Sequence, residues 1–91
     1  PQSERRPVEN REIISRDQKK KLFDELRNER KRIAKKKNIP VYLVFNNRTL
    51  YEMSELLPNT QEMMLHIKGV GPAKMSMYGW NFLTIIKKLL V

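Results

Sequence analysis

The segment that decides the fold of this chain is IKGVGPAK, residues 67–74. It carries two glycines one residue apart, a proline directly after the second glycine, and a lysine on each side. Gly71 suits the residue that caps a helix, and Pro72 suits the first helical turn, where the missing proline N–H costs nothing. The segment therefore predicts a tight turn between two helices, the second beginning at about residue 72.

The same turn has the chemistry of a phosphate-binding element. Glycines let the backbone approach a phosphate without a Cβ in the way, and a helix N-terminus offers unpaired N–H groups and a partial positive charge. The segment resembles the hairpin of helix-hairpin-helix DNA-binding proteins, with Lys68 and Lys74 beside it. A turn that only packs the two helices is the alternative. The segment at residues 67–74 is not a nucleotide-binding P-loop, because that loop requires the pattern G-x-x-x-x-G-K-[S/T].

Helical signals precede the turn. Ser15 and Gln18 have the S-x-x-Q spacing of a capping box, and apolar residues recur at helical spacing from Leu22 onward, which predicts a helix over residues 17–37. Pro40 ends that helix by restricting the residue before it. The next stretch, VYLVF at residues 41–45, is rich in β-branched and aromatic residues. Because the chain offers no second strand to pair with it, we expect a short, buried helical turn.

Two shorter helices and a long one complete the expected fold. Asn46 or Asn47 caps the first, Pro58 ends it, and Asn59 with Glu62 predicts a second capping box. The expected inward residues of the first short helix are Leu50, Met53, Leu56 and Leu57. Those of the last helix are Ala73, Tyr78, Phe82, Leu83, Ile86 and Leu90. A glycine inside the last helix, Gly79, predicts a kink or a close helix contact. The expected fold is all-α, a compact five-helix bundle.

Composition and charge narrow the function. The chain has 91 residues, no cysteine, and a net charge of +9 from 19 basic and 10 acidic residues. A field of that size on a small body attracts polyanions. Residues 1–37 hold 14 basic and 7 acidic groups, a net of +7, and residues 38–91 hold 5 and 3, a net of +2. We expect residues 1–14 to be a flexible basic linker and residues 15–91 to form the domain. The longest apolar run is far short of the roughly 20 residues of a membrane helix, and no signal-peptide core opens the chain.

No catalytic set is visible in the sequence. The single histidine, His66, has no second histidine or cysteine with which to hold a metal. Ser54 and Ser76 have no histidine placed to activate them, and the acidic residues are scattered. We therefore expect a non-catalytic domain without a cofactor or metal.

The order of the motifs resembles the helicase and RNase D C-terminal (HRDC) domain over about residues 17–90. The resemblance rests on LF-x-x-LR-x-x-R at 22–30, IP-x-Y-x-x-F at 39–45, TL-x-x-M at 49–53, P-x-T at 58–60, and GVGPAK and YG-x-x-F at 69–74 and 78–82. It implies a five-helix bundle that assists nucleic-acid binding, as an auxiliary domain of a RecQ-type DNA helicase acting in DNA repair and recombination. It also implies an intracellular parent enzyme, in the bacterial cytoplasm or a nucleus. An RNase D-like exonuclease acting on RNA is one alternative parent, and a regulatory domain docking on proteins is another reading.

The expected partners are single-stranded or structured DNA, with RNA and the parent helicase core as alternatives, bound by a monomer that does not engage a membrane. The resemblance implies that Tyr42 contributes to single-strand binding, which is physically sensible because an aromatic ring beside a lysine run can stack on a base while the lysines meet phosphates. The candidate nucleic-acid-binding residues are Lys31, Lys35, Lys36, Tyr42, Arg48, Lys68, Gly69, Gly71 and Lys74.

Overall fold

The computed structural model describes residues 14–90, and these residues form helices and loops without a strand. The elements are α2 (Arg16–Lys37), the 3-10 turn η2 (Val41–Leu43), α3 (Asn47–Leu56), α4 (Gln61–Leu65), α5 (Pro72–Lys74), the π turn η3 (Met75–Gly79) and α6 (Trp80–Leu90). The expected all-α class is confirmed. Because α5, η3 and α6 follow one another as one helical run, the five expected helical segments are four helices and one 3-10 turn.

The helix boundaries are set by capping residues. The capping box at Ser15 is confirmed, since its hydroxyl accepts from the Gln18 amide and the Gln18 side chain accepts from the Ser15 amide. Asn46 caps α3 by accepting from the amide of Thr49 at 2.7 Å. The expected cap at Asn59 is wrong: the residue with extended backbone before α4 is Thr60, whose hydroxyl accepts from Met63 N.

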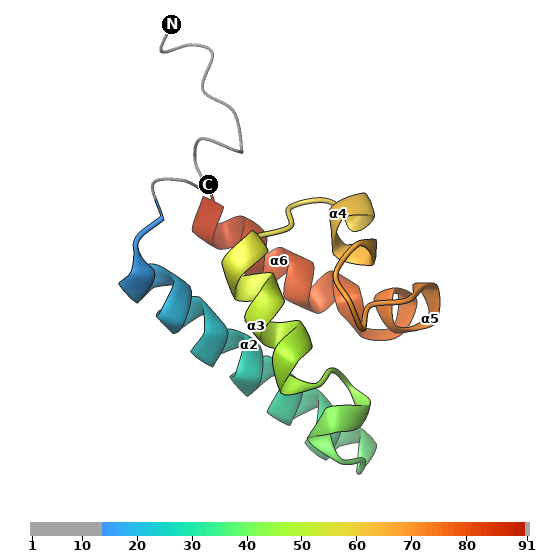
Figure 1. Ribbon diagram of the computed structural model, residues 1–91. Helices are drawn as coiled ribbons and strands as arrows, with labels where there is room; N and C mark the ends of the chain where they lie inside the picture. Colours follow the sequence, from blue (N-terminus) through green and yellow to red (C-terminus); the bar gives the residue numbers. More distant parts are fainter. Residues whose placement is uncertain (1–13, 91) are drawn as a thin grey trace, which may run out of the picture.

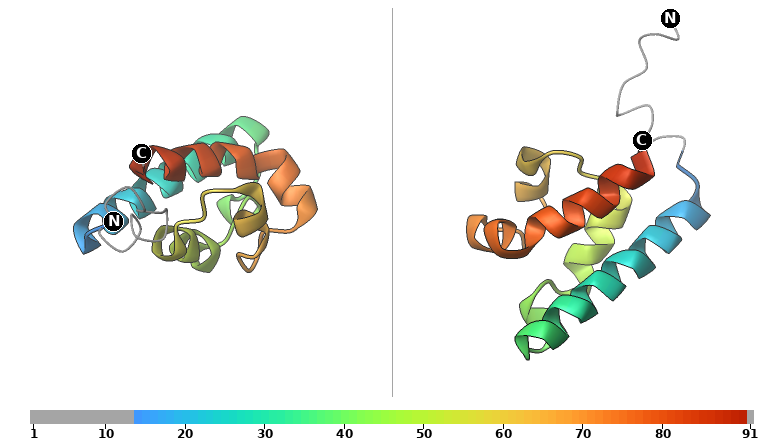
Figure 2. Two further views of the ribbon diagram at one scale, coloured as in Figure 1. Left: turned by 90° about the horizontal axis from the view of Figure 1, so that it is seen from above. Right: turned by 180° about the vertical axis from the view of Figure 1, so that it is seen from behind.

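The two longest helices, α2 and α6, lie antiparallel to each other. The N-terminal half of α2 shares one cavity with the C-terminal half of α6, and the C-terminal half of α2 shares another with η3 and the start of α6. Helix α3 packs against α2 on another side, and α4 lies against η3 and α6 (Figures 1 and 2). The glycine turn between α4 and α5 therefore lies at one end of the molecule, away from the N-terminal end of α2 (Figure 1).

The core is centred on Phe45. Its ring meets Phe82 edge to face at 5.1 Å and Tyr78 at 6.2 Å between centroids, geometries that add roughly 0.5–1.5 kcal/mol beyond area burial. The carbonyl of Phe45 accepts a 2.9 Å hydrogen bond from the buried Arg30 guanidinium. This bond ties the loop after η2 to α2, so Phe45 connects α2 with the helical run of η3 and α6.

Three burial expectations are corrected. Val41–Leu43 do form a helical turn, but all three side chains are exposed, and only Val44 and Phe45 turn inward. Leu56 is exposed because the helix ends there and Leu57, with a left-handed φ of 51°, turns its side chain into the core instead. Ala73 is exposed because it lies in the first turn after the glycine hairpin.

The expected distortion at Gly79 is present. Gly79 ends the π turn η3, and a Cβ there would lie 2.4 Å from the sulfur of the buried Met75. The close contact is therefore made by a side chain of the same helical run. π turns of this kind interrupt the regular hydrogen bonding of a helix.

The predicted linker, residues 1–14, lies outside the described residues except for Ile14, and Val91 lies outside them too. Across residues 14–90, no helix is both long enough and apolar enough to cross a bilayer.

Candidate nucleic-acid interface

The C-terminal half of α2 carries a run of exposed cations. Lys31, Lys35 and Lys36 are all exposed there, with Lys37 completing the last turn. Lys31 and Lys35 are one helical turn apart and so share a face. The three terminal lysines also lie where the negative end of the helix dipole favours cations. None of these four lysines is within 4.0 Å of a carboxylate in the described part of the chain.

Tyr42 lies just beyond this helix, on η2. Its side chain is 64% exposed, and the neighbouring Val41 and Leu43 are exposed as well. The Tyr42 ring is therefore not part of the core. Val41 lines a surface cavity with Arg27, Arg30 and Lys31, so the exposed turn borders the basic surface of α2.

The glycine hairpin is held by one polar contact. The hydroxyl of Thr49 on α3 donates to the carbonyl of Lys68 at 2.9 Å. Gly69 has a φ of +98°, which L side chains rarely adopt, whereas Gly71 is extended with a φ of −94° and caps α5. Both glycines and Lys68 are exposed. The positive φ at residue 69 therefore requires glycine. At residue 71 no atom lies within 4 Å of where a Cβ would be, so the glycine leaves open space that a ligand could use.

The two remaining predicted cations have partners of their own. Arg48 in the first turn of α3 lies 3.7 Å from Glu52, one turn later. Lys74 is half-buried, and its ammonium lies 6.0 Å from the centroid of the Phe45 ring. Lys74 is therefore less exposed than the α2 lysines, whereas the Arg48 side chain remains 79% exposed.

The structure brings the end of α2 and the hairpin together around a pair of aromatic rings. Lys37 lies 5.7 Å from the Tyr78 ring centroid, and Lys74 lies near Phe45. Since Phe45 and Tyr78 touch edge to face, two lysines from distant parts of the chain meet on adjacent rings. Of the predicted residues, Lys74 is thus one ring away from Lys37, which directly follows the predicted Lys35 and Lys36, and Arg48 is next in the chain to Thr49, which bonds to the hairpin.

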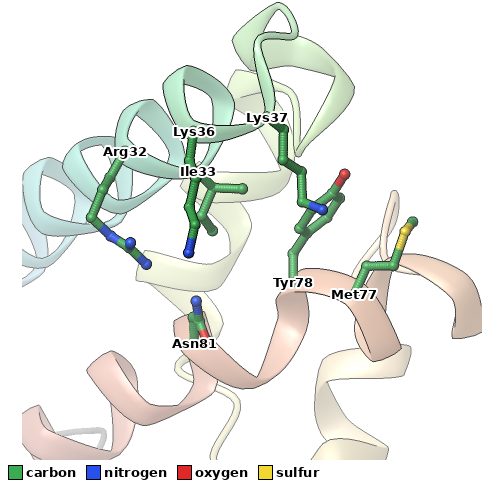
Figure 3. Close-up of a pocket in the computed structure, with 7 residues that line it drawn as sticks. All are labelled: Arg32, Ile33, Lys36, Lys37, Met77, Tyr78 and Asn81. Carbon is green, nitrogen blue, oxygen red and sulfur yellow. The ribbon is translucent and has the colours of Figure 1, made fainter.

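The α2–α6 groove is a surface cavity of about 340 Å³ lined by Arg32, Ile33, Lys36, Lys37, Met77, Tyr78 and Asn81. Figure 3 shows the basic side chains of α2 projecting towards Asn81 and Tyr78 on the opposite wall. Of these residues only Lys36 was among the predicted site residues. The four-residue spacing of Arg32 and Lys36 indicated a shared helix face, but nothing local indicated which part of α6 lies opposite.

One acidic side chain neutralises part of this groove. The Arg32 guanidinium donates to the carboxylate of Glu29, and Asn81 donates to it at 3.0 Å. The hydrogen bond from Arg32 lowers the pKa of Glu29 below its ordinary value, and outweighs the partial burial that acts to raise it. Because Glu29 binds Arg32 and Asn81, it forms no ion pair with Lys36 or Lys37. These two lysines are therefore the cations of the groove that have no carboxylate partner among the described residues.

Arg30 is a cation of a different kind. Its side chain is buried, its Nε has no hydrogen-bond partner, and its guanidinium is held through the bond to Phe45. Burial lowers the pKa of Arg30, and the nearby charge of Arg27 lowers it further. Its role in the described structure is to position the loop before α3.

Within residues 14–90, no three histidine, cysteine or carboxylate side chains gather where they could hold a metal ion. The ring Nδ1 of His66 lies 2.9 Å from the carbonyl of Glu62 in the preceding turn, so this histidine is engaged locally.

Comparison with known proteins identifies the family. The HRDC domain model matches residues 19–86, so the chain belongs to the HRDC domain family. It is 46% identical over 69 residues to the ATP-dependent DNA helicase RecQ of Haemophilus influenzae, which is 76% of this chain and 11% of that protein. It is 44% identical over 66 residues to RecQ of Bacillus subtilis, 72% of this chain and 11% of that protein. It is 33% identical over 76 residues to the ATP-dependent DNA helicase UvrD2 of Mycobacterium tuberculosis, 84% of this chain and 11% of that protein. The chain therefore spans about a tenth of the length of these relatives.

Proposed function

We propose that this chain is an auxiliary nucleic-acid-binding domain of a RecQ-type DNA helicase, which binds single-stranded or junction DNA weakly and helps to target the enzyme to its substrate. The observation that carries this proposal is the run of unpaired lysines at residues 31–37 beside the exposed ring of Tyr42. Lysines that follow a nucleic-acid backbone, together with an aromatic platform for bases, are what sequence-independent single-strand binding requires.

The similarity to RecQ proteins supports DNA as the ligand, and an exonuclease parent acting on RNA is the alternative within the same class. Among residues 14–90, no side-chain pattern indicates the reading of base edges. Discrimination between RNA and DNA depends on contacts to the 2′-hydroxyl. The proposed binding mode is therefore contact of lysines with phosphates, together with stacking of bases on an aromatic ring. No chemistry is assigned to the domain itself.

Salt dependence tests the proposal. The isolated chain should bind an oligothymidylate with Kd on the order of 10⁻⁴ to 10⁻⁶ M, and log affinity should fall as log salt rises. Replacing Lys35 and Lys36 with alanine should flatten that slope by roughly 1.4, at about 0.7 per phosphate contact of a single strand. Tyr42→Ala should lower affinity without changing the slope, since stacking releases no counterions. Absence of binding at low salt would reject the proposal.

Phosphate binding by the glycine hairpin is tested separately, by NMR chemical shifts. If the amides after Gly71 also meet a phosphate, amide chemical shifts of residues 69–74 should move on addition of the oligonucleotide. Lys74→Ala should then weaken binding, while the loss in the free energy of unfolding should stay near the roughly 0.5–2 kcal/mol that a cation over an aromatic ring contributes. Fixed shifts in the hairpin, with movement only around residues 35–42, would show that the turn serves packing alone.

A docking function on protein is the second candidate. The three consecutive exposed apolar side chains of η2, Val41, Tyr42 and Leu43, favour it, because side chains of that kind are enriched at protein interfaces. Salt-independent binding to the parent helicase core, without affinity for oligonucleotides, would support this function in place of the first.

A further inference from the structure

The start of α6 exposes two large apolar side chains next to the α2–α6 groove. Met77 is 57% exposed and Trp80 is 49% exposed. Trp80 is the only tryptophan of the chain. An exposed aromatic side chain close to basic residues has the components of a single-strand binding surface, in which bases stack on rings and phosphates meet cations. The core around Phe82 is complete without either side chain.

The position of Trp80 follows from its place in the chain. Met77, Tyr78 and Asn81 line the groove from the α6 side. Trp80 is the residue directly before Asn81 and the first residue of α6. Its exposed side chain therefore starts next to the α6 wall of the groove, although Trp80 itself does not line the cavity.

The other wall of the groove supplies charge. Lys36 and Lys37 reach into it from α2, as Figure 3 shows, and no carboxylate of the described residues pairs with either ammonium. The nearest acidic group, Glu29, is engaged by Arg32 and Asn81. The α6 wall of the groove thus has Met77 in its lining and the exposed Trp80 next to it in the chain, and the α2 wall has two cations available to an anionic ligand.

We propose that Trp80 and Met77 form a stacking platform for an unpaired base, and that Lys36 and Lys37 hold the phosphates of the same single strand as it crosses the α2–α6 groove. This inference rests on the proposed nucleic-acid-binding function and names its base-binding site. The ligand is a single strand because only an unpaired base offers its face to an aromatic side chain. A duplex encloses its base faces and would meet the lysines alone.

This site is separate from the surface around Tyr42. Tyr42 lies on η2, beyond the end of α2, and the cavity beside η2 shares no lining residue with the groove, since it is formed by Val41 and by residues 24–31 of α2. The lysine run at the end of α2 therefore has an aromatic side chain on each flank, Tyr42 on one side and Trp80 on the other. Substitutions at Tyr42 and at Trp80 therefore test two different base-binding surfaces.

The single tryptophan provides a direct test in the unmodified chain. Titration with an oligothymidylate should quench the fluorescence of Trp80 and saturate at the Kd measured by anisotropy of a labelled strand. Trp80→Ala should lower affinity for the oligothymidylate about 5- to 150-fold, the loss of one stacked base, without changing the salt slope. Trp80→Phe should retain most of the affinity. The same variants should bind a blunt duplex as the unmodified chain does.

The lysines are tested against a charge-matched control. Alanine at Lys36 and Lys37 should reduce the salt slope by roughly 1.4, whereas alanine at Lys87 and Lys88, exposed near the far end of α6, removes the same charge away from the groove and should reduce it less. Thermal unfolding of each variant checks that the fold is kept.

The outcomes separate the two proposals. If Trp80 fluorescence is unchanged at saturating oligothymidylate and Trp80→Ala binds normally, the groove is not the base site, although the domain still binds nucleic acid. An equal loss of duplex affinity in Trp80→Ala would overturn stacking as the mechanism. If the unmodified chain binds no oligonucleotide at low salt, the proposed function fails together with this inference.

Discussion

The sharpest test of the fold is Gly69→Ala in the hairpin. Gly69 has a φ of +98°, and a Cβ built there would lie only 2.2 Å from the hydroxyl oxygen of Thr49. Holding a non-glycine residue at such a φ costs about 1–3 kcal/mol. Displacing the Thr49 hydroxyl from the Lys68 carbonyl removes a hydrogen bond with a net contribution of about 1 kcal/mol. The expected loss in the free energy of unfolding is therefore about 2–4 kcal/mol.

The matched control is Gly71→Ala, two residues away in the same turn. Gly71 has an extended φ of −94°, and no atom lies within 4 Å of its hypothetical Cβ. Alanine is a poorer helix N-cap than glycine, but it also reduces the entropy of the unfolded chain, so the net loss should stay within about 1 kcal/mol.

Thermal and urea unfolding monitored by circular dichroism would measure both variants. For a domain of this size, 1 kcal/mol corresponds to about 4–8 °C, so Gly69→Ala should lower Tm by roughly 8–30 °C. In a Thr49→Ala background the Gly69→Ala change should cost about 1 kcal/mol less, since the hydroxyl is absent. Equal stability of Gly69→Ala and Gly71→Ala would refute the conformational assignment of this turn.

Three further predictions concern capping and pH. Thr60→Ala should destabilise the domain by about 1 kcal/mol, measured by urea unfolding, while Asn59→Ala should have little effect; the reverse order would contradict the observed cap of α4. Ser15→Ala should also cost about 1 kcal/mol and should fray the first turn of α2, visible as faster amide hydrogen exchange there. The bond from Arg32 lowers the folded-state pKa of Glu29, so its contribution is present above the ordinary glutamate pKa and lost as pH falls through the folded value. Glu29→Gln should therefore show a shallower decline of Tm in acid than the unmodified chain, and parallel curves would argue against this ion pair.

Some features of this fold could be predicted because they depend on residues close together in the chain. The capping box at Ser15, the cap at Asn46 and the Gly71–Pro72 helix start are all contacts within one helical turn, and all three are present. Asn59 was a wrong prediction because two adjacent residues, Asn59 and Thr60, both suit a cap, and the course of the chain after Pro58 selects between them.

The burial of single side chains was harder to predict. Leu56 and Leu57 are equally apolar, and which of them enters the core depends on the left-handed conformation of Leu57 at the end of α3. Val41–Leu43 have the composition of buried residues, yet the turn that they form lies on the surface. Hydrophobicity alone does not settle such cases, because a small domain has too little polar surface to cover itself.

The sequence by itself determined the helical class, the positions of most helix ends and the concentration of positive charge in the first helix, because these properties depend on composition and on neighbours within about four residues. Only the tertiary structure decided that Lys37 and Lys74 approach adjacent aromatic rings, that Asn81 joins Arg32 on Glu29, and that a basic wall of α2 faces the exposed start of α6. Those relations join residues about 30 to 50 positions apart, and they arise when the helices pack around Phe45. No local pattern encodes the distance between them.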